Sequence, residues 1–164
     1  MFDEKFKVVG EVTAKLYRDG RLVNEREMKN LVVSHGLMSI LGPMLDSNVN
    51  DAPTVMSNKL SAIKVGSGQI APSANNTSLE VLLATSTSVA NQYEDGSSPT
   101  TSNDVLTKGI PVFAEFSGQA STMAITEAGL FMGDVLFSRI VFPVMTLGTN
   151  DRLQIFWNIK LVSA

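Results

Sequence analysis

The sequence contains no cysteine, a single histidine and few charged residues, and each shortage restricts the available chemistry. Without cysteine, disulfide bonds and thiolate metal ligands are excluded. With one histidine, any histidine-dependent general base or nucleophile relay would have to use His35. That residue directly follows Ser34, a residue type that often caps the start of a helix, so a structural role explains both residues. We therefore predict that the protein has no catalytic residues and is not an enzyme.

The low charge and the absence of long apolar runs also narrow the choice of partners. Charged residues make up 18% of the 164 residues, and the net charge is -3. Nucleic-acid-binding proteins usually carry a basic patch, whereas lysine and arginine are scattered here, so we expect no nucleic-acid partner. The first five residues lack the pattern of a signal peptide, and no apolar run approaches the roughly 18 residues that span a bilayer. We expect no membrane partner and synthesis in the cytoplasm.

Two stretches resemble ligand-binding loops, but each lacks an essential part. The first is an alternation of possible calcium ligands: Asp46, Asn48, Asn50 and Asp51. It lacks the central glycine and the terminal glutamate of a calcium-binding loop. The second, Gly66-Ser67-Gly68, follows a predicted strand as a phosphate-binding loop does. There, Pro72 and a Ser/Asn-rich run replace the helix whose N-terminus would hold the anion. We therefore predict no metal and no cofactor.

Alternating apolar and polar residues predict β-strands along most of the chain. Residues 6–16 alternate cleanly, Asp19-Gly20 suits a tight hairpin turn, and residues 21–28 return as a strand with mixed faces. Further strands are predicted at 60–65, at 110–116 and in three runs after residue 124. The sequence therefore predicts a single mainly β domain over residues 1–164, an antiparallel β-sandwich of jelly-roll type with one short α-helix that begins at Ser34.

A long polar segment interrupts this pattern between residues 85 and 104. It consists largely of Ser, Thr, Asn, Gly and Pro, and Tyr93 is its one aromatic residue. A loop of this length within a compact domain is uncommon, and such loops are usually mobile or functional. We predict a mobile or interface loop that becomes ordered when it packs against a neighbouring chain.

The C-terminal strands are apolar on both faces. In residues 153–161 the odd positions, which include Trp157, form an apolar register that we expect to be core and to face residues 6–16. Phe156 falls in the opposite register of this run, and Phe137 and Val141 lie beside Arg139 on the outward register of the preceding run, 135–142. A strand that is apolar on both faces is either central or covered by another subunit. We therefore predict a protein–protein interface that comprises these outward residues and the aromatic residue of the long loop: Phe137, Arg139, Val141, Phe156 and Tyr93.

Three blocks of the sequence resemble tailed-bacteriophage virion proteins. They are Asn30-Leu31-Val32-Val33-Ser34-His35-Gly36-Leu37; Ile63-Lys64-Val65-Gly66-Ser67-Gly68 with Ala71-Pro72 and Thr77-Ser78-Leu79 after it; and Ile125-Thr126-Glu127-Ala128-Gly129-Leu130-Phe131. Similar blocks occur in this order in stand-alone phage structural proteins and in the collar-type N-terminal domains of phage tail fibres. The resemblance implies a non-enzymatic β-sandwich that assembles as an oligomer, often a trimer, on the virion.

The resemblance also implies the partners, which would be other virion proteins: the major capsid protein, or tail and neck proteins. A fibre protein would continue into a long shaft, whereas this sequence ends at Ala164, directly after its last predicted strand. We therefore expect a capsid decoration (cement) protein that stabilises the head through multivalent contacts. The alternatives are a tail-fibre anchor and a collar, neck or baseplate component. A glycan-binding module is less favoured, because Trp157 falls in the inward register and sugar sites usually offer an exposed aromatic ring.

Overall fold

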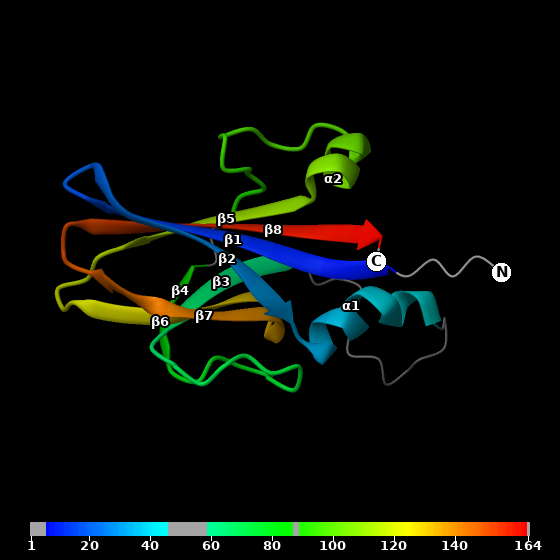
Figure 1. Cartoon of the computed structure of the whole chain (residues 1–164), viewed down its shortest axis with the longest axis horizontal. Helices are drawn as coiled ribbons and strands as arrows, with labels where there is room; N and C mark the ends of the chain where they lie inside the picture. Colours follow the sequence, from blue (N-terminus) through cyan, green and yellow to red (C-terminus); the bar gives the residue numbers. More distant parts are fainter. Residues whose placement is uncertain (1–5, 46–58, 87–88, 164) are drawn as a thin grey trace.

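The computed structural model describes residues 6–45, 59–86 and 89–163, so the calcium-like stretch at 46–51 lies outside the described residues. Eight strands form one sheet, and two helices accompany it (Figure 1). The elements are β1 (Phe6–Arg18), β2 (Arg21–Val32), α1 (Ser34–Leu45), β3 (Leu60–Gly66), β4 (Leu82–Ser86), α2 (Ser102–Lys108), β5 (Ile110–Ser117), β6 (Met123–Met132), β7 (Val135–Leu147) and β8 (Asp151–Ser163). The prediction of a mainly β, antiparallel protein is confirmed.

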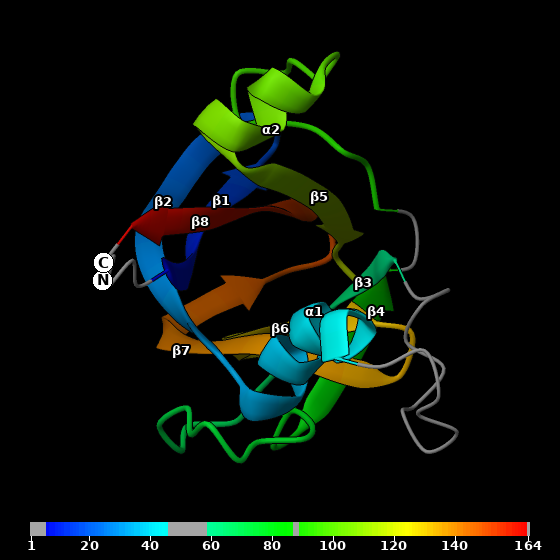
Figure 2. The same ribbon diagram turned by 90° about the vertical axis from the view of Figure 1, so that its right-hand side faces the viewer.

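The sheet curls on itself until it is nearly a barrel. Its strand order is β4-β3-β6-β7-β2-β1-β8-β5. Viewed end-on in Figure 2, β1, β8 and β5 form one side, β7, β6 and β3 form the other, and β2 runs along one flank. The connection between the two sides is narrow, because β2 pairs with β7 only through Leu31 and Val32. This near-closure encloses the main hydrophobic core between the two sides.

The hairpin of β1 and β2 follows directly from its turn residues. Asp19 and Gly20 have φ values of 49° and 77°, the left-handed conformation that a two-residue hairpin turn of this kind requires. The two strands then pair from Arg18 and Arg21 down to Gly10 and Asn30. The predicted hairpin is therefore confirmed.

The odd positions of β8 do form the core, as the alternation predicts. Leu153, Ile155, Trp157 and Ile159 are buried, whereas Leu161 lies beyond the core and is 64% exposed. The prediction that this register faces residues 6–16 is wrong, because β8 lies beside β1 in the same sheet, with Trp157 opposite Val12. Alternation identifies the buried face of a strand, but it does not distinguish a neighbouring strand from one across the core.

A β-bulge in β7 changes which of its residues point inward. Leu130 and Phe131 of β6 oppose Ser138 and Leu136, which leaves Phe137 as an extra residue in β7. Phe137 therefore packs in the main core, whereas Leu136 belongs to a second cluster of buried residues. A strict two-residue period predicts the reverse, and this reversal explains why Phe137 was assigned to the outer face.

The structure contains two short helices where one was predicted. The helix from Ser34 is present as α1, and α2 lies in and beyond the segment predicted as a long loop. Thr101 and Asp104 form a capping box at the start of α2, in which each side chain hydrogen-bonds the backbone N–H of the other residue. The T-x-x-D spacing that forms this box was present in the sequence, and α2 is the one helix that the prediction missed within the described residues.

Candidate functional site

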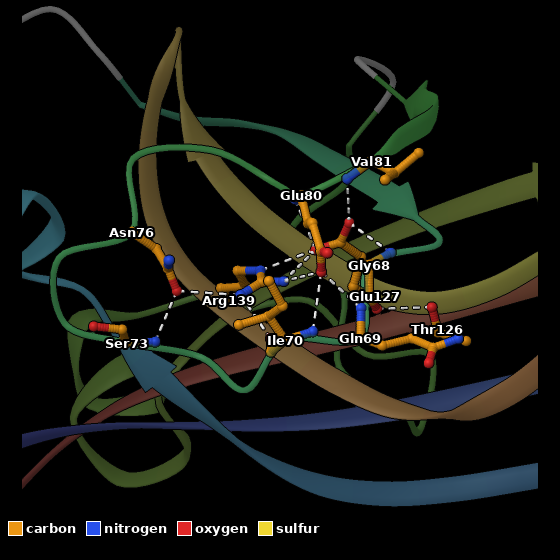
Figure 3. A network of polar contacts seen from close by, with 10 residues as sticks. All are labelled: Gly68, Gln69, Ile70, Ser73, Asn76, Glu80, Val81, Thr126, Glu127 and Arg139. Carbon is orange, nitrogen blue, oxygen red and sulfur yellow. Dashed lines mark hydrogen bonds and ion pairs between the residues drawn. The ribbon is translucent and has the colours of Figure 1, made fainter.

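A fully buried carboxylate lies at the centre of the most elaborate polar network among the described residues. Glu127 on β6 is 0% exposed, and its carboxylate accepts hydrogen bonds from three backbone N–H groups. The donors are Gly68 at 3.0 Å, Glu80 at 3.2 Å and Val81 at 2.9 Å. They lie at the two ends of the segment 67–81, which connects β3 to β4 and is called the connecting loop below. The carboxylate thus holds both ends of this loop against the sheet (Figure 3).

Glycine is required where the loop meets the carboxylate. A Cβ atom on Gly68 would lie 2.5 Å from Glu127 Oε1 and 2.5 Å from the Cβ atom of Glu80. A Cβ atom on Gly66 would collide with the carbonyl oxygen of Val81. The Gly66-Ser67-Gly68 motif therefore does form part of an anion-binding cradle, but the bound anion is the side chain of Glu127 from the same chain.

Arg139 on β7 neutralises this buried charge. It is 1% exposed, and its Nε and Nη2 atoms lie 2.9 Å and 2.8 Å from Glu127 Oε2. Its Nη1 atom donates to the carbonyl oxygen of Ile70 at 3.1 Å and to Asn76 Oδ1 at 3.2 Å. A cation buried to this extent requires a compensating charge, and the ion pair supplies it while also binding the middle of the connecting loop.

A second glutamate of the loop extends the network towards the surface. Glu80 Oε2 accepts hydrogen bonds from the backbone N–H groups of Gln69 at 2.7 Å and Ile70 at 2.9 Å, and it lies 3.9 Å from Arg139 Nη2. Thr126 donates from its hydroxyl to the carbonyl oxygen of Gly68 at 2.8 Å. Through these contacts the two halves of the connecting loop are joined to each other as well as to the sheet.

The environment keeps Glu127 ionised. Burial alone raises the pKa of this carboxyl, but the hydrogen bonds from Val81, Arg139, Glu80 and Gly68 outweigh it, and the net result is a lowered pKa. Every oxygen of the carboxylate is engaged by donors within the chain. The pair therefore acts as a clamp for the connecting loop and is not arranged as an acid–base pair for a substrate.

The three sequence blocks singled out above meet at this clamp. The second block contributes Gly66 and Gly68, and the third contributes Glu127. The first block crosses from β2 into α1 beside them. There, the N–H of Val33 donates to the carbonyl oxygen of Phe137 at 3.1 Å, and the N–H of Ser34 donates to the carbonyl oxygen of Ala74, in the connecting loop, at 2.9 Å. A cluster of buried apolar residues fills the space beneath. Val33, Leu79 and Phe131 come from the three blocks, Ala62 from β3 just before the second block, and Leu136 from β7.

Two of the five residues predicted for an outward interface belong to the interior of the chain instead. Phe137 is 3% exposed in the main core, and Arg139 forms the buried ion pair, so their predicted outward exposure is wrong. Val141 lies opposite Glu127 on the outer face and is half-buried. Arg139 is therefore part of the clamp and Val141 lies beside it, and neither forms an exposed apolar surface.

Tyr93 and Phe156 come together on the opposite side of the sheet. Tyr93 is 8% exposed, and its hydroxyl donates to the carbonyl oxygen of Gly109 at 2.8 Å. Phe156 is half-buried, and its ring centroid lies 4.8 Å from that of Phe113. Both residues line a small open hollow, together with Gln92 and Glu94. The segment after β4, predicted to need a neighbouring chain for order, thus packs Tyr93 against its own sheet.

Sequence reasoning missed Glu127, Glu80 and Asn76 as parts of one site. One signal was available: Glu127 and Arg139 are isolated charges within otherwise apolar strands, and such charges are usually paired when buried.

Within the described residues, no cluster of three or more potential metal ligands occurs, and no helix has the length and apolarity needed to cross a membrane. In the comparisons with known proteins, no family model, curated protein or solved structure matches the chain.

Proposed function

We propose that the protein is a non-enzymatic structural component of a tailed-bacteriophage virion, and specifically a capsid decoration protein. The observation that carries the proposal is the meeting of the three resembling blocks around Glu127 and Arg139. Blocks that are distant in sequence but share one buried network form a single structural unit. The resemblance therefore concerns one unit of the fold, which supports the proposal more strongly than three separate short matches would.

The connecting loop is the surface that we assign to a partner virion protein, such as the major capsid protein. It exposes two apolar side chains, Ile70 at 66% and Val81 at 46%, on a backbone that the buried ion pair holds from beneath. A preorganised loop loses little conformational entropy on binding, so more of the contact energy remains as affinity. This loop takes the place of the outward residues of β7 as the proposed contact surface.

Such a protein stabilises a capsid by binding only the assembled state. The stabilisation of each site is RT ln(1 + [L]/Kd), about 2.7 kcal/mol when the free protein is at a hundred times Kd. Many equivalent sites on one shell multiply this effect. A sandwich of jelly-roll type and a homotrimeric state belong to the same proposal, and the narrow connection between the two sides of the sheet supports the sandwich.

Copy number tests the proposal most directly. Quantitative mass spectrometry of purified virions should find hundreds of copies per particle, located on the head by antibody labelling in electron micrographs. A dozen copies or fewer would contradict decoration and indicate a tail-fibre anchor or a collar, neck or baseplate component. Absence of the protein from purified particles would refute a virion role altogether.

A matched pair of variants tests the assigned surface. Ile70→Asp should abolish binding of the purified protein to particles that lack it, because it places a charge in the centre of the proposed contact. Val144→Asp should bind normally, since Val144 is similarly exposed, at 51%, but lies on β7 outside the connecting loop. Equal binding by both variants would remove the loop from the proposal.

A further inference from the structure

The segment between β4 and α2 crosses the outer side of β5 and β8 (Figures 1 and 2). Residues 90–101 of this segment are called the strap below. Tyr93 is the only buried residue of the strap, and α2, which follows it, buries no side chain. The small open hollow described above separates part of the strap from Thr13 and Phe156 on the sheet. A segment with so few buried contacts has a low local stability.

Two contacts hold the strap against β5 and the residue that precedes it. The backbone groups of Ala90 and Phe113 exchange two hydrogen bonds, from the N–H of Ala90 at 3.0 Å and from the N–H of Phe113 at 2.8 Å. The hydroxyl of Tyr93 donates to the carbonyl oxygen of Gly109 at 2.8 Å. Immediately before the strap, Val89 packs against the main core. The strap is therefore fixed at its start and bound to the sheet at a few separate points.

The remaining contact, through Glu94, can be broken at little cost. The carboxylate of Glu94 accepts a hydrogen bond from the hydroxyl of Thr13 at 3.0 Å and lies 2.7 Å from the Nζ atom of Lys15. When the strap lifts, Glu94 passes into water, and Lys15 keeps a second carboxylate, that of Glu25, at 3.3 Å. Opening thus leaves no buried charge without its partner, which is the outcome that makes the loss of an ion pair expensive.

The strap also has hydrogen bonds of its own that do not depend on the sheet. The N–H of Tyr93 donates to the carbonyl oxygen of Ser97 at 2.8 Å, and the N–H of Gly96 donates to that of Tyr93 at 3.0 Å. These bonds close a turn within the strap. Because the turn survives when the contacts with the sheet break, the strap moves as one piece.

We propose that the strap is a reversible cover for the edge of β5, and that it opens as a unit while the sheet stays folded. Strand β5 is the last strand of the sheet, and among the described residues its outer edge pairs only with Ala90. An uncovered edge presents backbone groups to other strands, so the closed strap shields this edge and the open strap exposes it together with Phe113 and Phe156. The inference does not rest on the proposed function, because it concerns the isolated chain.

Hydrogen exchange of single amides in β5, followed by NMR, tests the opening. Successive N–H groups of a strand point to opposite sides, so the N–H of Phe113 faces the strap, whereas those of Val112 and Ala114 face β8. After correction for intrinsic rates, the amides of Phe113 and Ala90 should exchange about a hundredfold faster than those of Val112 and Ala114. Equal protection of Phe113 and Ala114 would overturn the proposal, because β5 and the strap would then open only together.

A matched pair of variants tests whether the strap opens as a unit. Glu94 lies outside the Ala90–Phe113 pair, yet Glu94→Ala should speed exchange at the Phe113 amide about threefold to tenfold, since it removes a distant contact of the same unit. Glu11→Ala removes an exposed ion pair with Lys160 on the same face and should leave that exchange rate within about twofold of wild type. An unchanged rate in Glu94→Ala, or an equal acceleration in both variants, would contradict opening as a unit.

Discussion

The buried ion pair of Glu127 and Arg139 makes a strong prediction about stability. Replacement of Glu127 by glutamine keeps the shape of the side chain but removes its charge. Arg139, 1% exposed, would then remain as a buried cation without its counter-charge. The new amide group would also direct N–H donors at the backbone N–H groups of the connecting loop, so that at least one of them loses its acceptor.

Both effects have known magnitudes. Leaving a buried hydrogen-bonding group unpartnered costs about 1–3 kcal/mol, and removal of one partner from a buried ion pair typically costs about 3–5 kcal/mol in total. We therefore expect Glu127→Gln to lower the free energy of unfolding by about 3–5 kcal/mol at pH 7. Arg139→Met should cost less, because the carboxylate keeps its three backbone donors. The double variant should cost less than the sum of the two single changes.

The loss should depend on pH in a defined direction. Because the pKa of Glu127 is lowered in the folded state, its contribution to stability is complete above the ordinary glutamate pKa of about 4.3. It disappears as pH falls through the lowered pKa of the native carboxyl. The difference between wild type and Glu127→Gln should therefore be constant above about pH 5 and should shrink below about pH 4.

Urea unfolding monitored by Trp157 fluorescence measures these differences, since this residue is the sole tryptophan and is buried in the core. The matched control is Glu11→Gln, which removes an exposed ion pair with Lys160 and should change stability by about 0–1 kcal/mol. A loss below about 1 kcal/mol for Glu127→Gln, or a loss that does not change between pH 7 and pH 3, would refute the reasoning.

Three further predictions concern other parts of the fold. Gly68→Ala should lower the free energy of unfolding by about 1–3 kcal/mol in the same urea assay, because its Cβ atom would lie 2.5 Å from the carboxylate of Glu127. Tyr93→Phe removes the 2.8 Å hydrogen bond from the Tyr93 hydroxyl to the carbonyl oxygen of Gly109. The loss of this bond should lower the free energy of unfolding by about 1–2 kcal/mol and speed proteolysis within residues 89–104. Asp151→Asn should lower the melting temperature at pH 7 but have little effect near pH 2. Hydrogen bonds from Arg18 and from the N–H of Gly148 hold the pKa of Asp151 below its usual range. The contribution of Asp151 to stability is therefore lost on acidification.

Much of the fold could be predicted from local sequence because it depends on local rules. The alternation of apolar and polar residues in 6–16 and 153–161 predicts β1 and β8, and Asp19-Gly20 predicts the hairpin turn. Ser34 began the helix at the predicted place. The burial of Trp157 also follows from local sequence, since the side chains of a strand alternate between its two faces.

The site could be predicted less well, because its parts are joined only by long-range contacts. Glu127 and Arg139 are recognisable as isolated charges, but nothing local indicates that they pair diagonally across β6 and β7. The Gly66-Ser67-Gly68 motif indicates an anion-binding loop, and only the folded chain shows that the anion is its own carboxylate. The resembling blocks were visible as three separate segments, while their shared location was not.

The sequence by itself thus determined most of the strands, where the first hairpin turns and which face of β8 is buried, since these depend on neighbours within a few residues. Tertiary structure alone decided three other features. One bulge placed Phe137 inside, antiparallel pairing placed β8 beside β1 in the same sheet, and the clamp around Glu127 holds the connecting loop in place. Each of these arises where strands distant in sequence meet, and the balance of burial and charge there is set by both partners together.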